Sequence, residues 1–200
     1  MKSNIVFLCL VFGFVGSTFA NEAAYKICVT CHAEDGSGIV AMNSPAIAGQ
    51  EIWYLERQLN NFKTGLRGTN QSDIFGMQMR PMATTLATDE MVSSVAKYVN
   101  AMIPEPYEKT VTGNVEAGKQ FYVTCTACHG ADGKGIEVMN SPNLTIQQDW
   151  YLVRQLQNYK SGLRAYDPSD IYGQQMKPMA MLLPDNIAIN DVVAYINTLR

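Results

Sequence analysis

The sequence predicts an all-α protein built from two tandem copies of one helical domain. Residues 122–197 repeat residues 25–100 at a constant offset of 97, without a gap. About half of the aligned residues are identical, which marks an internal duplication. Within each copy, apolar residues recur at steps of three and four, and no segment alternates convincingly between apolar and polar residues. We therefore expect each copy to consist of short helices joined by long loops.

The first twenty residues have the pattern of a secretory signal peptide. Lys2 precedes an apolar run over residues 5–16, and small residues follow up to Ala20. A membrane anchor is the alternative, but the run is shorter than the roughly 20 residues that span a bilayer, and no basic stop signal follows it directly. We predict cleavage near Ala20 and a mature protein in the periplasm.

A proline-containing connector separates the two copies. Pro104 and Pro106 disfavour helix, and the residues that follow them are mostly polar. We predict a signal peptide over residues 1–20, domain 1 over 21–103, a linker over 104–114 and domain 2 over 115–200. Each copy then has about 85 residues, a size at which a side-chain core alone is marginal and a further stabilising group is usual.

The apolar periodicity indicates where helices lie. One stripe occupies the middle of the first copy, another closes it, and the closing stripe recurs in the second copy; the residues are Ile52, Leu55, Leu59 and Phe62, then Val92, Val95, Val99 and Met102, then Ile189, Val192, Ile196 and Leu199. Thr88 or Asp89 in the first copy and Asp185 in the second are suited to begin the final helix. Each copy should therefore end in an amphipathic helix.

Composition and charge exclude a nucleic-acid-binding role. The chain has 15 basic and 18 acidic residues and a formal charge of −3, without the basic excess that such proteins need. Of the five cysteines, Cys9 falls in the predicted signal peptide, which leaves four in an oxidising compartment. Two disulfides would be the ordinary expectation there, but the spacing of these cysteines indicates another use.

Two Cys-x-x-Cys-His motifs stand at matching places in the two copies. They contain the four remaining cysteines and both histidines of the chain: Cys28, Cys31 and His32, then Cys125, Cys128 and His129. The motif is a signature of covalent haem attachment, with the histidine as an axial ligand of the iron. A redox-active dithiol needs no following histidine, and adjacent Cys128 and His129 would not easily both bind one tetrahedral zinc ion. We therefore predict two covalently bound haem c groups.

A Met-x-Pro-Met sequence in each copy can supply the second axial ligand. It lies at the same offset in both copies, just before the final helix, and offers Met79 or Met82 in the first copy and Met176 or Met179 in the second. A thioether opposite a histidine raises the reduction potential and closes the iron to other ligands. Such a site suits electron transfer better than the binding of oxygen or peroxide.

The whole mature chain resembles the dihaem class I cytochromes c of the cytochrome c4 type, in its duplication, its two haem motifs and its methionine motifs. The resemblance implies two tandem class I cytochrome c domains, each a few short helices wrapped around a covalent haem. In that family the ligand methionine lies seven residues before an apolar residue that opens the last helical block. Leu86 and Leu183 are those apolar residues here, which implies Met79 and Met176 as ligands. The second methionine of each pair would then pack on the haem edge.

The same resemblance implies a role for one proline in each copy. Pro45 and Pro142 each stand thirteen residues after the histidine of the haem motif, where a proline carbonyl in this family accepts the imidazole N–H and fixes the ring. The alternative is a loop proline that merely ends a segment.

Four arginines and two tryptophans also recur at matching positions: Arg57 and Arg154, Arg67 and Arg164, Trp53 and Trp150. A guanidinium suits a haem propionate because its planar fork pairs with carboxylates, but solvated charge at a helix end is an equal alternative. The tryptophans either line the haem crevice or belong to an ordinary core.

The first copy departs from the family pattern at its start. The second copy opens with a segment at residues 115–120 like the first helix of the family, whereas the predicted mature first copy begins at Asn21, opposite Gly118. We expect a shorter opening helix in domain 1.

These features predict an electron carrier and not an enzyme. The resemblance implies two haems that approach across a domain interface, and a place between a membrane quinol-oxidising complex and a terminal oxidase or reductase. We expect a monomer, peripheral to the membrane, that docks briefly through small surfaces. The alternatives are the cytochrome subunit of a dehydrogenase complex and a dihaem peroxidase. A peroxidase needs an open iron, whereas both copies offer a methionine.

Overall fold

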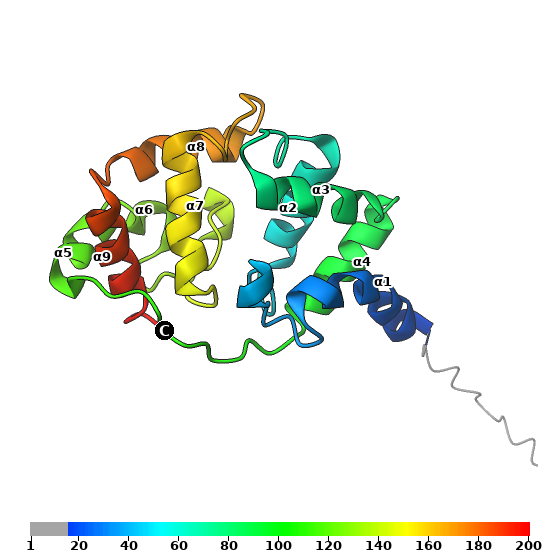
Figure 1. Ribbon diagram of the computed structural model, residues 1–200. Coiled ribbons are helices and arrows are strands. Elements are labelled where there is room, and N and C mark those ends of the chain that lie inside the picture. Colours follow the sequence, from blue (N-terminus) through cyan, green and yellow to red (C-terminus); the bar gives the residue numbers. More distant parts are fainter. Residues whose placement is uncertain (1–15) are drawn as a thin grey trace, which may run out of the picture.

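The computed structural model describes residues 16–200, which form two helical domains joined by an extended linker (Figure 1). The helices of domain 1 are α1 (Gly16–His32), the 3-10 helix η1 (Val40–Met42), α2 (Ile52–Thr64), α3 (Ile74–Thr84) and α4 (Asp89–Asn100). Those of domain 2 are α5 (Val115–Tyr122), α6 (Thr126–His129), the 3-10 helix η2 (Glu137–Met139), α7 (Asp149–Ser161), α8 (Ile171–Met181) and α9 (Asn186–Ile196). Apart from two isolated antiparallel bridges, the described residues contain no β structure, so the all-α prediction is confirmed.

Both domains arrange their helices in the same way. In Figure 1, α2 and α7 lie toward the middle of the molecule, with α1 and α4 at one outer end and α5 and α9 at the other. Helix α1 packs on α4 as α5 packs on α9, and α2 contacts α3 and α4 as α7 contacts α8 and α9. The duplication seen in the sequence is therefore a duplication of packing.

The start of the chain is described only from Gly16, so residues 1–15 of the predicted signal peptide lie outside the described residues. Helix α1 runs without a break from Gly16 to His32, whereas the matching stretch of domain 2 is divided into α5 and α6. The shorter opening helix that we expected concerned a chain that begins at Asn21, and it stays a prediction. Between residues 16 and 200, no single helix is long and apolar enough to cross a membrane. Only α8 and α9 taken together, with a bend of 109° between them, reach the required length and composition.

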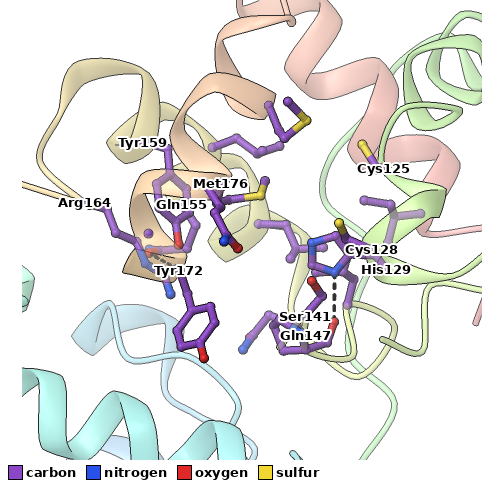
Figure 2. Close-up of a pocket in the computed structure, with 18 of the residues that line it drawn as sticks. Cys125, Cys128, His129, Ser141, Gln147, Gln155, Tyr159, Arg164, Tyr172 and Met176 are labelled. Atoms are coloured by element: carbon purple, nitrogen blue, oxygen red, sulfur yellow. Dashed lines mark hydrogen bonds between the residues drawn. The ribbon is translucent and has the colours of Figure 1, made fainter. Parts of the chain in front are cut away.

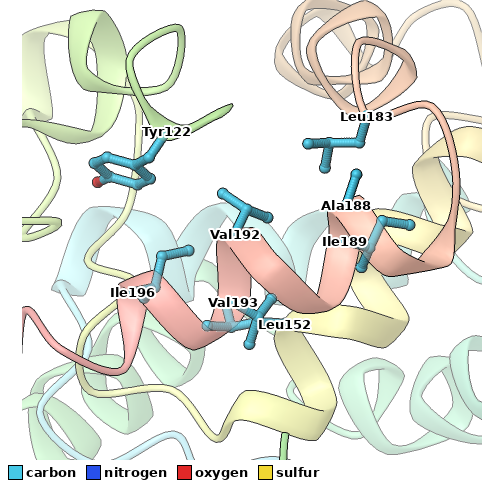
Figure 3. Packing of buried hydrophobic residues seen from close by; sticks show 8 residues of the cluster. All are labelled: Tyr122, Leu152, Leu183, Ala188, Ile189, Val192, Val193 and Ile196. Atoms are coloured by element: carbon cyan, nitrogen blue, oxygen red, sulfur yellow. The ribbon is translucent and has the colours of Figure 1, made fainter. Parts of the chain in front are cut away.

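Each domain has its own hydrophobic core around its last helix. In domain 2 this core consists of Tyr122, Leu152, Leu183, Ala188, Ile189, Val192, Val193 and Ile196 (Figure 3). The matching core of domain 1 consists of Tyr25, Leu86, Val92, Val95 and Val99. Buried Tyr25 and Tyr122 each donate a hydrogen bond to a backbone carbonyl just after the haem motif, at 2.8 and 2.9 Å. These bonds tie the motif to the core of its domain.

Side-chain caps fix where the helices beside the methionine motifs begin. Thr88 accepts a hydrogen bond from the Met91 N–H and Asp185 one from the Ala188 N–H, which confirms both expected starts of the final helices. Asp73 and Asp170, which the sequence reasoning did not single out, cap α3 and α8 in the same way, at 3.0 Å. The residue that donates to each of them is a glycine, because a Cβ there would collide with the capping carboxylate.

The linker is fastened to domain 2. Residues 103–114 form no helix and run along the molecule from α4 to α5 (Figure 1). The carboxylate of Asp149, which is fully buried, accepts hydrogen bonds from the backbone N–H groups of Thr110 and Val111 at 2.7 and 2.9 Å. Asn197 donates to the same carboxylate at 3.1 Å. One buried charge therefore joins the linker, α7 and the C-terminal end of α9.

Candidate haem sites

Each domain contains a cavity onto which its haem motif opens. The cavity of domain 2 has a volume of about 340 Å³ and that of domain 1 about 190 Å³. Together the two linings include every site residue predicted from the sequence: Cys28, Cys31, His32, Pro45 and Met79 in domain 1, and Cys125, Cys128, His129, Pro142 and Met176 in domain 2. The apolar stripe of α2 also faces the cavity, through Leu55, Leu59 and Phe62. That stripe therefore lines a ligand site as well as supporting the core.

The two histidines are held alike. Each side chain is 7% exposed, and its Nδ1 lies 2.9 Å from the Pro45 carbonyl oxygen in domain 1 and 3.0 Å from that of Pro142 in domain 2. Because a carbonyl oxygen can only accept, Nδ1 carries the proton and Nε2 keeps its lone pair for a metal. Burial lowers the pKa of both histidines, although the hydrogen bond to proline opposes this effect. Both rings are therefore neutral at neutral pH, as a metal ligand must be.

The four cysteines of the motifs are free thiols at the same cavity walls. Burial raises the pKa of Cys28 to about 11 and also raises that of Cys125. A redox-active dithiol needs the opposite shift, toward a low pKa. Within residues 16–200, Cys, His, Asp and Glu side chains nowhere gather in a group of three or more that could hold a metal ion such as zinc. The geometry thus favours thiols available for covalent attachment.

The methionine motifs lie on α3 and α8, each of which contains the proline of its motif. Both methionines of each pair line the cavity of their domain. Figure 2 shows the thioether of Met176 directed across the cavity toward the wall that carries Cys128 and His129. Met179 is 40% exposed, whereas Met176 is half-buried. The geometry favours Met176 over Met179 as a ligand, and Met79 stays a prediction because Met82 is buried to a similar degree.

This donor set fits a covalently attached iron porphyrin: two thiols and a neutral imidazole on one wall, with a thioether opposite. The sequence profile of the cytochrome c family matches this chain twice, over residues 20–102 and 115–200. The chain belongs to the cytochrome c family. Each half of this cytochrome therefore carries one covalently bound haem c, as the sequence predicted.

Known relatives place the chain more closely within the family. It is 34% identical over 167 residues to cytochrome c4 from Thiocapsa roseopersicina, which covers 78% of this chain and 81% of the relative. It is 32% identical over 174 residues to the thiosulfate dehydrogenase electron acceptor of Stutzerimonas stutzeri strain A1501, covering 80% of this chain and 75% of the relative. The fold matches the crystal structure of reduced recombinant cytochrome c4 from Pseudomonas stutzeri, with a TM-score of 0.70, 24% identity, and coverage of 93% and 100%. The chain is a dihaem electron-transfer cytochrome of the c4 type.

The recurring arginines of this cytochrome cross between its domains. Arg67 donates to the Tyr151 hydroxyl and Gln155, at 2.9 and 3.0 Å, and Arg164 makes the equivalent bonds to the Tyr54 hydroxyl and Gln58, at 3.0 and 3.2 Å. Arg164 is only 7% exposed, so the solvated-charge interpretation is wrong for it. Although burial opposes it, the neighbouring tyrosines hold the pKa of Arg164 above its usual range.

The second pair of arginines also reaches across the interface. Arg57 donates to the Asn140 carbonyl oxygen at 2.9 Å, and Arg154 to Asn43 Oδ1 at 2.6 Å. Each stacks on an aromatic ring of the other domain, Tyr172 for Arg57 and Phe75 for Arg154, at 4.5 and 4.4 Å from the ring centroid. All four arginines line the cavities, Arg57 and Arg164 that of domain 2, Arg67 and Arg154 that of domain 1. Their role toward the haem propionates stays a prediction.

Sequence reasoning missed the partners of these arginines and left two interpretations of the tryptophans open. Tyr54, Gln58 and their counterparts Tyr151 and Gln155 are identical in the two copies, and that identity was the available signal. Neither tryptophan lines the cavity of its domain; each lies beside the arginine four residues further along the same helix, within cation–π distance. The haem-crevice role is therefore not supported for them.

Proposed function

We propose that this cytochrome carries single electrons in the periplasm between a respiratory donor and a terminal acceptor. The observation that carries the proposal is a neutral, buried histidine in each cavity, with the methionines of the Met-x-Pro-Met motif lining the same cavity. When bound, haem c supplies an iron that changes its charge by one electron. The ligands we propose are His32 with Met79 and His129 with Met176. Such closed sites support a carrier and disfavour a peroxidase.

The protein contributes stiffness and a short path between the two halves. The hydrogen bonds to Pro45 and Pro142 hold each imidazole in one orientation, so little must rearrange when the charge of the site changes. The two cavities adjoin at the interface, because the same side chains line both: Gln50, Tyr54, Gln58, Gln147, Tyr151 and Gln155. This shared wall supports electron passage from one domain to the other.

The proposed partners follow from the predicted location. A protein exported by the predicted signal peptide would meet a membrane quinol-oxidising complex as donor and a terminal oxidase or reductase as acceptor. We propose a monomer that works at the membrane periphery and docks transiently. A second candidate is the cytochrome partner of a dehydrogenase, which is favoured by the similarity to a protein named as the electron acceptor of thiosulfate dehydrogenase.

The experiment that tests this proposal is an optical spectrum of the purified, reduced protein before and after addition of carbon monoxide. Intact-mass analysis of the same sample should show two covalent haems. Two low-spin haems that ignore the gas are the expected result. Prompt carbon monoxide binding at either site would contradict closed His/Met coordination and favour an enzyme or a sensor.

A further inference from the structure

In each domain, one peptide group accepts a hydrogen bond from the haem-motif histidine through its carbonyl oxygen and donates another through its N–H. In domain 2, the Pro142 carbonyl oxygen faces the ring of His129, and the N–H of the same peptide group, on Asn143, donates to both carboxylate oxygens of Glu51 at 3.2 and 3.3 Å. Glu51 belongs to domain 1, directly before α2. A side chain of one domain therefore touches the peptide that orients the histidine of the other domain.

Domain 1 has the same arrangement with one chemical difference. The Pro45 carbonyl oxygen faces His32, and the N–H of that peptide group, on Ala46, donates to Oε1 of Gln148 at 3.2 Å. Gln148 is the counterpart of Glu51 in the repeat, so the histidine of domain 1 is supported by an amide and that of domain 2 by a carboxylate. The duplication thus supplies its own matched comparison: the same bonds, with the charge on one side only.

We propose that Glu51 is a positioning residue that lowers the reduction potential of the domain 2 site relative to that of domain 1. A charged acceptor strengthens the hydrogen bond from Asn143 and polarises the peptide, which makes the Pro142 oxygen a stronger acceptor for the His129 N–H. A more electron-rich imidazole favours the oxidised iron. The inference rests on the proposed function, because it requires His129 to be an axial ligand.

The surroundings of Glu51 offer a control for its charge. Glu51 is half-buried, and burial raises the pKa of its carboxyl, an effect to which the nearby charge of Glu137 adds and which the hydrogen bond from Asn143 opposes. Glu137 is exposed on η2, and the Asn143 N–H donates to Glu51 and not to the side chain of Glu137. Substituting Glu137 therefore removes a similar charge from the same region and leaves the hydrogen-bond chain intact.

The two histidines allow the test to resolve each site. Untagged protein labelled with ¹⁵N only in histidine gives one ring environment per domain, because the chain contains no other histidine. In the reduced protein at about pH 8, where the carboxylates are ionised, Glu51→Gln should move the Nδ1 signal of His129 and leave that of His32. Gln148→Glu should move His32 instead. Glu137→Gln should move neither.

Redox titration followed by the same two signals gives the thermodynamic result. Glu51→Gln should shift the equilibrium of electron sharing toward domain 2 by about three- to tenfold, and tenfold corresponds to about 59 mV for one electron. Gln148→Glu should shift it in the same direction, because it lowers the potential of domain 1. The inference is overturned if Glu51→Gln and Glu137→Gln have equal effects, or if the domain 1 site responds most to Glu51→Gln. The proposed function would still stand in that case, provided that the protein is low-spin and does not bind carbon monoxide. Carbon monoxide binding by the unsubstituted protein overturns both.

Discussion

Domain 1 and domain 2 agree most closely where they face their cavities. The distance from histidine Nδ1 to the proline carbonyl oxygen is 2.9 Å in domain 1 and 3.0 Å in domain 2. The hydrogen bonds that the capping aspartates of α3 and α8 accept are both 3.0 Å long. They differ in the contacts that support these sites. Asp149 fastens the linker to domain 2, whereas its counterpart in domain 1 is Ile52, which carries no charge.

The comparison shows which contacts a duplicated domain retains. A residue that crosses the interface has a buried partner in the other copy, and losing one member leaves the other unpaired at a cost of about 1–3 kcal/mol. The pairs made by Arg67 and Arg164 occur in both copies, and breaking either one would carry this cost. Glu51 and its counterpart Gln148 differ in charge but keep the same backbone hydrogen bond, because a carboxylate and an amide oxygen can both accept it.

The largest expected effect separates the two methionines of one motif. Met176→Ala should open the domain 2 site, so that the reduced protein binds carbon monoxide and the potential of that site falls by a substantial part of the roughly 0.8 V range that axial ligands span. Met179→Ala is the matched control and should leave the site closed, because Met179 is already 40% exposed. The result is read from the optical spectrum and a redox titration.

The same pair of variants in domain 1 sharpens the comparison between the halves. Met79→Ala should open that site and Met82→Ala should not, although the two side chains are buried alike. If Met82→Ala opened the site, the two domains would use different members of the same motif, and the symmetry of the sites would fail at the iron itself.

The second expected effect concerns the support that only domain 2 has. Asp149→Asn should lower the free energy of unfolding of domain 2 by about 2–4 kcal/mol, because a buried amide cannot accept from all the donors that surround the carboxylate. Urea unfolding followed by tyrosine and tryptophan fluorescence and by haem absorbance measures the change. Ile52→Ala, at the matching position of domain 1, is the control and should leave the stability of domain 2 unchanged.

Acid should weaken this support as well. Burial alone would raise the pKa of Asp149, but the hydrogen bonds from Val111, Asn197 and Thr110 outweigh it and hold that pKa below its usual range. Its stabilising contribution is therefore complete above the unfolded pKa of about 3.9 and is lost as the pH falls through the lower folded value. The Asn variant should lack this part of the acid dependence. An unchanged acid profile would show that other carboxylates dominate.

Much of the fold could be predicted because the duplication made local patterns visible twice. The apolar stripe at Val92, Val95 and Val99 marked a core helix correctly, and Thr88 and Asp185 marked where the last helices begin. The haem motifs predicted the cofactor because five consecutive residues carry the whole signal. These predictions succeeded where the physical cause lies within a few residues of chain.

The interface could not be predicted because its contacts join residues that lie far apart in the chain and are not at matching positions of the repeat. Arg164 and Tyr54 are 110 residues apart and meet only because the domains pack face to face. An arginine at a helix end looks solvated until the partner surface is known. The same holds for Glu51, whose significance depends on a peptide group in the other domain.

The smallest expected effect tests whether burial alone distinguishes the two halves of the interface. Arg67 and Arg164 donate to equivalent partners, but Arg164 is 7% exposed while Arg67 is partly open to solvent. A lysine cannot reproduce the planar fork at either position. Arg164→Lys should therefore cost about 2–3 kcal/mol in unfolding free energy and Arg67→Lys about 1 kcal/mol, because water replaces the lost bonds only at the exposed position. Equal costs would mean that the hydrogen bonds, and not their burial, set the strength of the interface. The two arginine sites would then contribute equally to stability despite their different exposure.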